Sequence, residues 1–264
     1  MNAICTTVTH YQGTDQQVAW HGIEYPNAPE FEAHLTHKVA PRVRDDEGGQ
    51  QFEATLRSVA ITGFANDALR AILEAAEPES RDWAIGEALA EVHLSEAHGV
   101  TWPWNTERDK RNPAASLPGA DLVGIMTDQQ GPLLVMGEVK TSSEVAAPPQ
   151  VMSGRSGMVH QLDTIASDLR ILGTLLKWLH FRCRNTPHEP TYKQAVKRLL
   201  DSSNRAIALF GVLVRDTTPA ERDLSARGRA LSATLQAPTV CYLIALHVPF
   251  PIGDLPIRCA GGAP

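Results

Sequence analysis

Two acids and a lysine lie close together near the middle of the chain, next to segments that are otherwise largely apolar. Asp121 comes directly before the apolar run Leu122–Met126. Glu138 and Lys140 come at the end of a second apolar run. Carboxylate oxygens are the ligands that a hard cation such as Mg²⁺ prefers, and a lysine beside the cation can orient or deprotonate a water molecule. If the three side chains meet, the chemistry that they indicate is metal-assisted hydrolysis of a phosphodiester bond.

A β-hairpin is the element that would bring these residues together. The two apolar runs are joined by the turn-rich segment Thr127–Pro132, which predicts a hairpin. Residues i and i+2 of a strand share a face, so Glu138 and Lys140 project together while Val139 points into the core. Asp121 then lies at the start of the partner strand.

The alternative is structural: Asp121 caps a turn, and Glu138 and Lys140 form an ion pair on a surface strand. The apolar flanks make a surface edge the less favoured interpretation. Two acids and a lysine in an apolar hairpin cost free energy unless they are paired or bound to metal. Both interpretations of Lys140 can hold at once when no metal is present.

At these residues the chain resembles a known superfamily. Pro118, Asp121, Glu138 and Lys140 have the spacing of the PD-(D/E)xK nuclease motif. More narrowly, Gly86-Glu87, the Gly-Ala-Asp121 segment and Gly-Glu138-Val-Lys140 are similar to the nuclease subunits of Hachiman-type anti-phage defence systems. In those systems a small nuclease works with a superfamily 2 helicase. The superfamily resemblance covers residues 80–250.

The resemblance implies a site and a cofactor. Mg²⁺, or Mn²⁺ in its place, would be held by Asp121, Glu138 and the backbone carbonyl of Val139. Glu87, on a helix upstream of the hairpin, would hold a second ion or an outer-shell water. Lys140 would position or deprotonate the attacking water and neutralise charge on the scissile phosphate.

The upstream helix is predicted to run from Asp82 to about His98. Glu87 and Glu91 lie four residues apart on it and therefore share a face. Glu87 is taken for the site because Gly86 precedes it, as in the resembling family, and Glu91 is the alternative. An exposed acidic stripe would have the same spacing. Gln161, at the start of the helix after the hairpin, is a further candidate for a phosphate contact, because relatives carry a glutamine there.

The rest of the chain predicts an α/β fold with a mixed central sheet flanked by helices, a restriction-endonuclease-like core with an N-terminal extension. Residues 1–78 are the expected extension, a partner-binding or gating region, and residues 79–264 are the nuclease-like domain. Buried strands are predicted at 206–214 and 240–248. Helices are predicted at 51–77, 159–183, 192–202 and 220–235, and a loop at 42–50.

Composition narrows the class of protein. The chain has 264 residues and a net charge of −6, but residues 170–205 carry eight basic and two acidic residues, a local charge of +6. That segment predicts a DNA contact, with solvated helix faces as the alternative.

No apolar run is long enough to span a bilayer, and the N-terminus lacks the pattern of a signal peptide. We therefore expect a cytoplasmic protein without a membrane contact. The four cysteines are widely separated and predict buried thiols.

The expected function is that of a Mg²⁺-dependent deoxyribonuclease, the effector of an anti-phage defence complex, held inactive by a helicase partner and acting with it. The alternative is a non-catalytic DNA-binding or adaptor subunit that keeps the nuclease-like fold. A restriction endonuclease with its own target sequence is a third class. No phosphate-binding loop of the Gly-x-x-x-x-Gly-Lys-Ser/Thr type is present, so ATP dependence would come from another chain.

Overall fold

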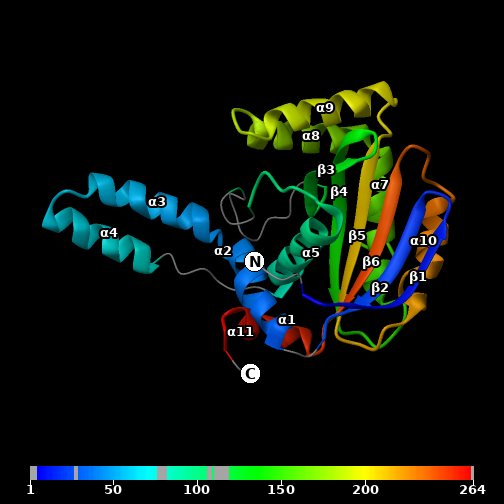
Figure 1. The fold of residues 1–264 in the computed structure, drawn as a ribbon, viewed down its shortest axis with the longest axis horizontal. Coiled ribbons are helices and arrows are strands. Elements are labelled where there is room, and N and C mark those ends of the chain that lie inside the picture. The colour runs from blue at the N-terminus through cyan, green and yellow to red at the C-terminus, as the bar shows by residue number, and fades with distance from the viewer. Residues whose placement is uncertain (1–4, 27–28, 76–81, 106–108, 110–118, 263–264) are drawn as a thin grey trace.

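A computed structural model describes residues 5–26, 29–75, 82–105, 109 and 119–262, without the side chains of residues 46, 75, 82 and 83. Its centre is one six-stranded sheet with the order β1-β2-β6-β5-β4-β3 (Figure 1). The strands are β1 (Val8–Asp15), β2 (Val18–Glu24), β3 (Leu122–Asp128), β4 (Gly131–Ser142), β5 (Ile207–Arg215) and β6 (Val240–His247). Strands β2, β6, β5 and β4 are parallel to one another, and β1 and β3 pair antiparallel at the two edges. The predicted α/β fold with a mixed sheet is confirmed.

Helices cover both faces of this sheet. On one face lie α1 (Pro29–His34), the π-helix η1 (Leu35–Val39), α2 (Ala40–Arg44), α5 (Asp82–His98) and α11 (Leu255–Cys259). On the other lie α7 (Met158–Ser167), α8 (Leu169–Cys183), α9 (Glu189–Asp201) and α10 (Ser225–Ser232). Short 3₁₀ turns are η2 (Gln150–Met152), η3 (Glu221–Asp223) and η4 (Ile252–Asp254). Two further helices, α3 (Asp46–Val59) and α4 (Gly63–Ala75), project away from the body (Figure 1).

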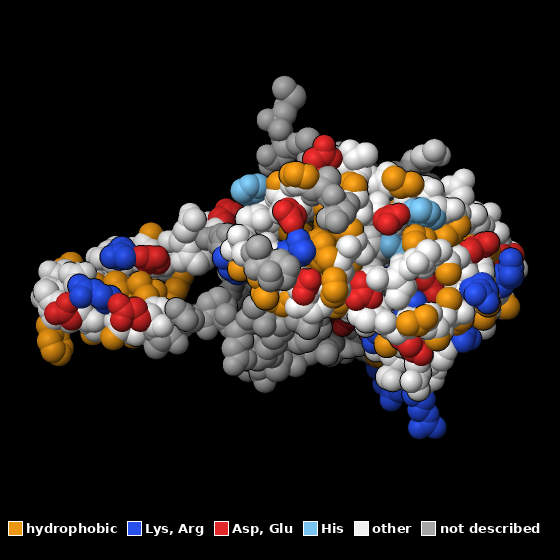
Figure 2. Space-filling view, turned by 90° about the horizontal axis from the view of Figure 1, so that it is seen from below, with side chains coloured by type: hydrophobic (Ala, Val, Ile, Leu, Met, Phe, Trp, Pro, Cys, Tyr) orange, Lys and Arg blue, Asp and Glu red, His pale blue; other side chains and the backbone are white. Residues whose placement is uncertain are grey.

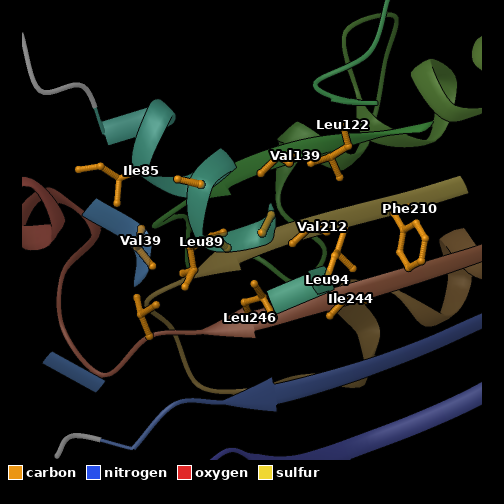
Figure 3. Packing of buried hydrophobic residues seen from close by; sticks show 14 of the residues in the cluster. Val39, Ile85, Leu89, Leu94, Leu122, Val139, Phe210, Val212, Ile244 and Leu246 are labelled. Atoms are coloured by element: carbon orange, nitrogen blue, oxygen red, sulfur yellow. The ribbon is translucent and has the colours of Figure 1, made fainter. Parts of the chain in front are cut away.

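The sandwich of helices around the sheet explains the apolar strands. Every residue of β5 is buried, as expected for a central strand of a sheet covered on both faces. On the α5 side, Ile85, Leu89 and Leu94 of the helix pack over Val139 and Val212 of the sheet (Figure 3). Burial of this kind contributes about 1.5–3 kcal/mol for each large apolar side chain. The sheet is therefore a rigid base for residues at its strand ends.

Several predicted elements are confirmed. The hairpin is β3 and β4, and the predicted upstream helix is α5. Gly99 follows α5 with a φ of +64°, the left-handed backbone conformation that favours glycine after a helix. The buried strands predicted at 206–214 and 240–248 are β5 and β6.

Other predictions were wrong in detail. Residues 42–50 are not a loop, because α2 ends at Arg44 and α3 begins at Asp46. The single helix predicted at 51–77 is two helices, since α3 ends at Val59 and α4 starts at Gly63. The long helix at 159–183 is interrupted at Asp168, whose carboxylate accepts a hydrogen bond from the Arg170 backbone N–H and so caps α8. The helix predicted at 220–235 is the short turn η3 followed by α10.

The N-terminal strands are part of the sheet. β2 pairs with β6, and β1 pairs with β2, so residues 8–24 share one sheet with the strands from residue 122 onward. A functional division between 1–78 and 79–264 stays a prediction. Among the described residues, no helix combines the length and the apolar character that crossing a bilayer requires.

Candidate active site

The site lies at the start of β3, where β4 continues beyond its partner strand. The β3–β4 register starts at the pair Leu122–Gly137, and the Asp121 N–H donates to the Gly137 carbonyl at 2.9 Å. β4 runs on to Ser142. There the Asp121 Oδ2 accepts a hydrogen bond from the Val139 N–H at 3.0 Å. The Asp121 carboxylate therefore accepts the hydrogen bond from β4 that the backbone of a longer β3 would otherwise accept.

Glu138 and Lys140 point to the face opposite α5. Val139 packs into the core under α5, while Leu134 and Met136 pack into the core on the α7 side. By strand alternation Glu138 and Lys140 share the α7 face. The Glu138 side chain is only 4% exposed, and its Lys140 neighbour is 21% exposed. The predicted pair is thus buried on one face and is not a surface ladder.

A glycine in β5 lets α7 approach the sheet beside Glu138. Gly211 is the β5 partner of Glu138 in the parallel register. A Cβ at Gly211 would lie 2.7 Å from the Met158 Sδ and 2.9 Å from a methyl carbon of Leu162, both in α7. A side chain at this position would therefore push α7 away. The glycine therefore allows α7 to pack closely against the sheet next to Glu138.

The three predicted side chains form one hydrogen-bonded group. The Lys140 Nζ donates to the Glu138 Oε1 at 2.6 Å. Burial, and then the neighbouring Asp121 carboxylate, raise the pKa of Glu138 to about 7, although Lys140 acts in the opposite direction. A hydrogen bond between the Glu138 and Asp121 carboxyl groups also favours the protonated form of Glu138. Lys140 therefore offsets only part of what burial and the second carboxylate cost the charged form of Glu138.

The backbone carbonyl of Val139 faces the same edge. The N–H and C=O of one strand residue point to the same side, and the Val139 N–H is directed at Asp121. The Val139 carbonyl thus opens onto the edge where the Asp121 carboxylate lies. Two carboxylates and a carbonyl are hard oxygen donors that suit Mg²⁺ or Mn²⁺. The chemistry of this donor set is what fits a hard cation, and a bound cation would offset the repulsion between the two carboxylates.

Glu87 belongs to the other face of β4. Gly86 of α5 lies against Thr141, where a Cβ on the glycine would come within 2.6 Å of the threonine Oγ1. Glu87 follows directly and is buried. No three His, Cys, Asp or Glu side chains among the described residues are arranged to hold a metal ion together. The structure therefore unites Asp121, Glu138 and Lys140 but does not gather Glu87 with the two acids, and its role stays a prediction.

Glu91, the alternative to Glu87, has a structural partner. Its carboxylate is 2% exposed and pairs with the Arg42 guanidinium of α2. Its backbone carbonyl accepts a hydrogen bond from the Trp102 Nε1 at 3.0 Å. These contacts tie α5 to α2 and to the loop after α5. They also explain how an acid is tolerated at this depth, because the charge is paired.

Gln161 lies in α7, on the helix that covers the face of Glu138. Its neighbour Leu162 is the residue that packs over Gly211. The Gln161 Oε1 is buried and has no hydrogen-bond partner within the part of the chain that the structure describes. A buried amide oxygen without a donor is destabilising. Gln161 therefore stays a candidate for a ligand or water contact on this helix.

Sequence reasoning missed Arg215, which supports the site from the next strand. Its guanidinium is 1% exposed and donates to the Ala146 carbonyl at 3.1 Å from Nη2. Its Nε lies 3.6 Å from the buried Asp223 carboxylate. Arg215 thus holds the segment that follows Lys140. The predicted strand at 206–214 ended one residue too early, and the arginine at the end of so apolar a run was the available signal.

The basic segment 170–205 is largely paired within the chain. Lys193 pairs with Glu189 and Lys197 with Asp201 along α9, and Arg170 pairs with Asp168. The Arg198 guanidinium binds both oxygens of Asp128 in the β3–β4 turn at 2.7 and 2.8 Å. That turn is the end of the hairpin away from Glu138. Hence a DNA contact through this segment stays a prediction.

Comparison with known proteins assigns no family to this chain, so the geometry of the acid pair is the guide to function. No protein-family model matches the chain, and no curated protein matches it either. The class of the site is therefore argued from the acid pair and its lysine, with the motif resemblance beside it.

Proposed function

We propose that this chain is a divalent-metal-dependent nuclease that hydrolyses phosphodiester bonds of DNA. The observation that carries the proposal is the contact between two carboxyl groups and an ammonium group at the end of a buried hairpin. Asp121 directly precedes β3, Glu138 lies in β4, and Lys140 donates to Glu138 at 2.6 Å. Such a set is expensive to bury unless it serves binding or catalysis.

Each residue has a role in this proposal. Asp121, fixed by the Val139 N–H, and Glu138 would hold the cation together with the Val139 carbonyl. A cation bound there would polarise a phosphate oxygen and lower the pKa of a bound water. Lys140, released from Glu138 when the cation takes over that charge, would position the attacking water and stabilise the charge of the scissile phosphate.

The biological setting follows from the resemblance alone. As the effector of an anti-phage defence complex, the nuclease would be held inactive by a helicase partner until DNA is exposed. An isolated chain that degraded plasmid DNA as fast as the complex would contradict this part of the proposal.

The second candidate is a non-catalytic DNA-binding or adaptor subunit. The specific observation in its favour is that Glu87 is not gathered with the two acids into a metal-binding group. In this case the Glu138–Lys140 contact would be a structural ion pair only.

Cleavage of supercoiled and linear DNA distinguishes the two. The wild type is compared with Glu138→Ala/Lys140→Ala, with Mg²⁺ or Mn²⁺, in the presence and absence of the helicase subunit. Asp128→Ala, an acid in the turn of the same hairpin, is the control and should cut like the wild type. Metal-dependent cutting that is lost only in the double variant supports the nuclease. DNA binding without cutting under every condition would support the adaptor.

A further inference from the structure

The projecting pair of helices buries very little of itself. We call α3, α4 and their connection, residues 46–75, the α3–α4 arm. Among its described side chains, between residues 47 and 74, only Leu69 is buried. Isolated helices of about 12–15 residues are marginal in water, and α3 and α4 have 14 and 13 residues. The arm therefore needs further packing to be stable.

Large apolar side chains cover the arm. Almost half of the exposed large hydrophobic residues of the described chain lie on it: Phe52 (59% exposed), Val59 (69%), Ile61 (86%), Phe64 (87%) and Ile72 (59%). Figure 2 shows hydrophobic side chains gathered along the arm, between acidic and basic residues. Aromatic side chains cover about 150–250 Å² each, and the lower end of that range bounds the smaller Val and Ile. With the exposed fractions above, the five residues together offer about 500 Å², about two thirds of the roughly 800 Å² that each partner buries in a standard protein interface.

The charges on the outer arm balance. Residues 51–70 contain two acids, Glu53 and Asp67, and two bases, Arg57 and Arg70. Each base pairs with one acid within the same helix, Arg57 with Glu53 and Arg70 with Asp67. This surface therefore has no net positive charge to attract nucleic acid or anionic lipid headgroups. It also meets no net repulsion from an identical surface.

We propose that the α3–α4 arm is a dimerisation element whose partner is the arm of a second copy of this chain. Two helical hairpins that meet through their apolar sides form a four-helix arrangement, and a two-fold axis pairs one patch with itself. The available area approaches that of a stable dimer. The residues that carry the apolar patch, 52–72, are balanced in charge, while the three further acids of the arm, at positions 46, 47 and 74, lie at its two ends. The arm is the part of the fold furthest from the sheet (Figure 1), so two bodies can join through it without covering the acid pair.

The test is the molar mass of the full chain in solution over a range of concentrations, measured by sedimentation. We expect a species of twice 28.7 kDa that dissociates on dilution. Phe52→Asp and Phe64→Asp should each weaken the association about tenfold or more, as substitutions of buried aromatic anchors do. Phe181→Asp is the matched control, since Phe181 in α8 is 56% exposed, against 59% for Phe52. It should leave the association unchanged.

Hydrogen exchange locates the interface independently of the variants. Amide protection in residues 47–74 should rise with protein concentration, while the sheet stays unchanged. A chain that remains a 28.7 kDa monomer at about 100 µM, far above the nM to µM range of specific interfaces, would overturn the proposal. A dimer that Phe52→Asp and Phe64→Asp leave intact would overturn it too, as would concentration-independent monomers that bind uncharged lipid vesicles through the arm.

Discussion

Replacement of Glu138 by glutamine tests the buried acid pair through stability alone, without any assay of activity. The substitution keeps the size of the side chain and removes its titration. In the folded wild type the pKa of this carboxyl group is raised from its ordinary value of 4.5 to about 7 by burial and by Asp121. The folded state therefore binds this proton more tightly than the unfolded state does.

The sign and size of the effect follow from linkage. Because the folded pKa is the higher one, the contribution of Glu138 to stability is most favourable below pH 4.5. It declines as the pH rises, until both states are ionised above pH 7. One pKa unit corresponds to about 1.4 kcal/mol, so the decline amounts to about 3 kcal/mol. Glutamine does not titrate. The free energy of unfolding of Glu138→Gln, measured relative to that of the wild type, should therefore rise by about 3 kcal/mol from pH 4.5 to pH 8.

Urea unfolding at pH 5, 6, 7 and 8 measures this difference. Titration of the groups that do not interact with Glu138 cancels when the variant is compared with the wild type at each pH. Asp201→Asn, at an exposed ion pair on α9, is the control and should change the profile by less than about 0.5 kcal/mol. Parallel profiles for Glu138→Gln and the wild type would refute the conclusion that Glu138 is buried against a second carboxylate.

Three further predictions concern the cation, the helix approach and the arginine support. At pH 8, Mg²⁺ or Mn²⁺ at one hundred times its Kd should stabilise the wild type by about 2.7 kcal/mol and Glu138→Gln much less, measured by thermal unfolding; equal shifts would contradict the assigned site. Gly86→Ala should destabilise by about 1–3 kcal/mol because its Cβ would meet the Thr141 Oγ1 at 2.6 Å, and Thr141→Ala in the same chain should recover part of that loss in urea unfolding. Arg215→Met should lower the free energy of unfolding by about 3–5 kcal/mol because it leaves Asp223 buried without its cation. The double variant Arg215→Met/Asp223→Asn should be more stable than Arg215→Met alone, measured by calorimetry. A double variant that is less stable than Arg215→Met would argue against the ion pair.

Sequence patterns predicted the centre of the site because that centre depends on local rules. A hairpin fixes which residues of two strands are neighbours, and alternation fixes which of them share a face. These two rules bring Asp121, Glu138 and Lys140 together, as the structure shows. The position of Glu87 depends instead on which face of the sheet α5 covers, and a pattern within the helix carries no information about that choice.

The missed elements have equally physical causes. Strand β1 lies at an edge of the sheet, and its residues are mostly exposed or half-buried, so it lacks the apolar pattern that marks a strand. The break between α3 and α4 was missed because both helices continue the apolar spacing across the turn at residues 60–62. The interruption at Asp168 replaces a single residue of a long helical pattern, and only the capping contact with Arg170 shows it.

The pairing of β2 with β6 sets an order for folding during synthesis. β2 ends at Glu24, and its neighbour in the sheet begins at Val240, so a ribosome adding 5–20 residues per second needs about 10–45 s to supply the missing strand. The β3–β4 hairpin and α5 can form during that interval, whereas β1 and β2 have no sheet to join. The β1–β2 hairpin therefore waits with one edge of β2 unpaired, and the arrival of the last strand closes the fold. A nascent chain stopped before residue 240 should accordingly expose residues 8–24 to a protease that the finished protein resists.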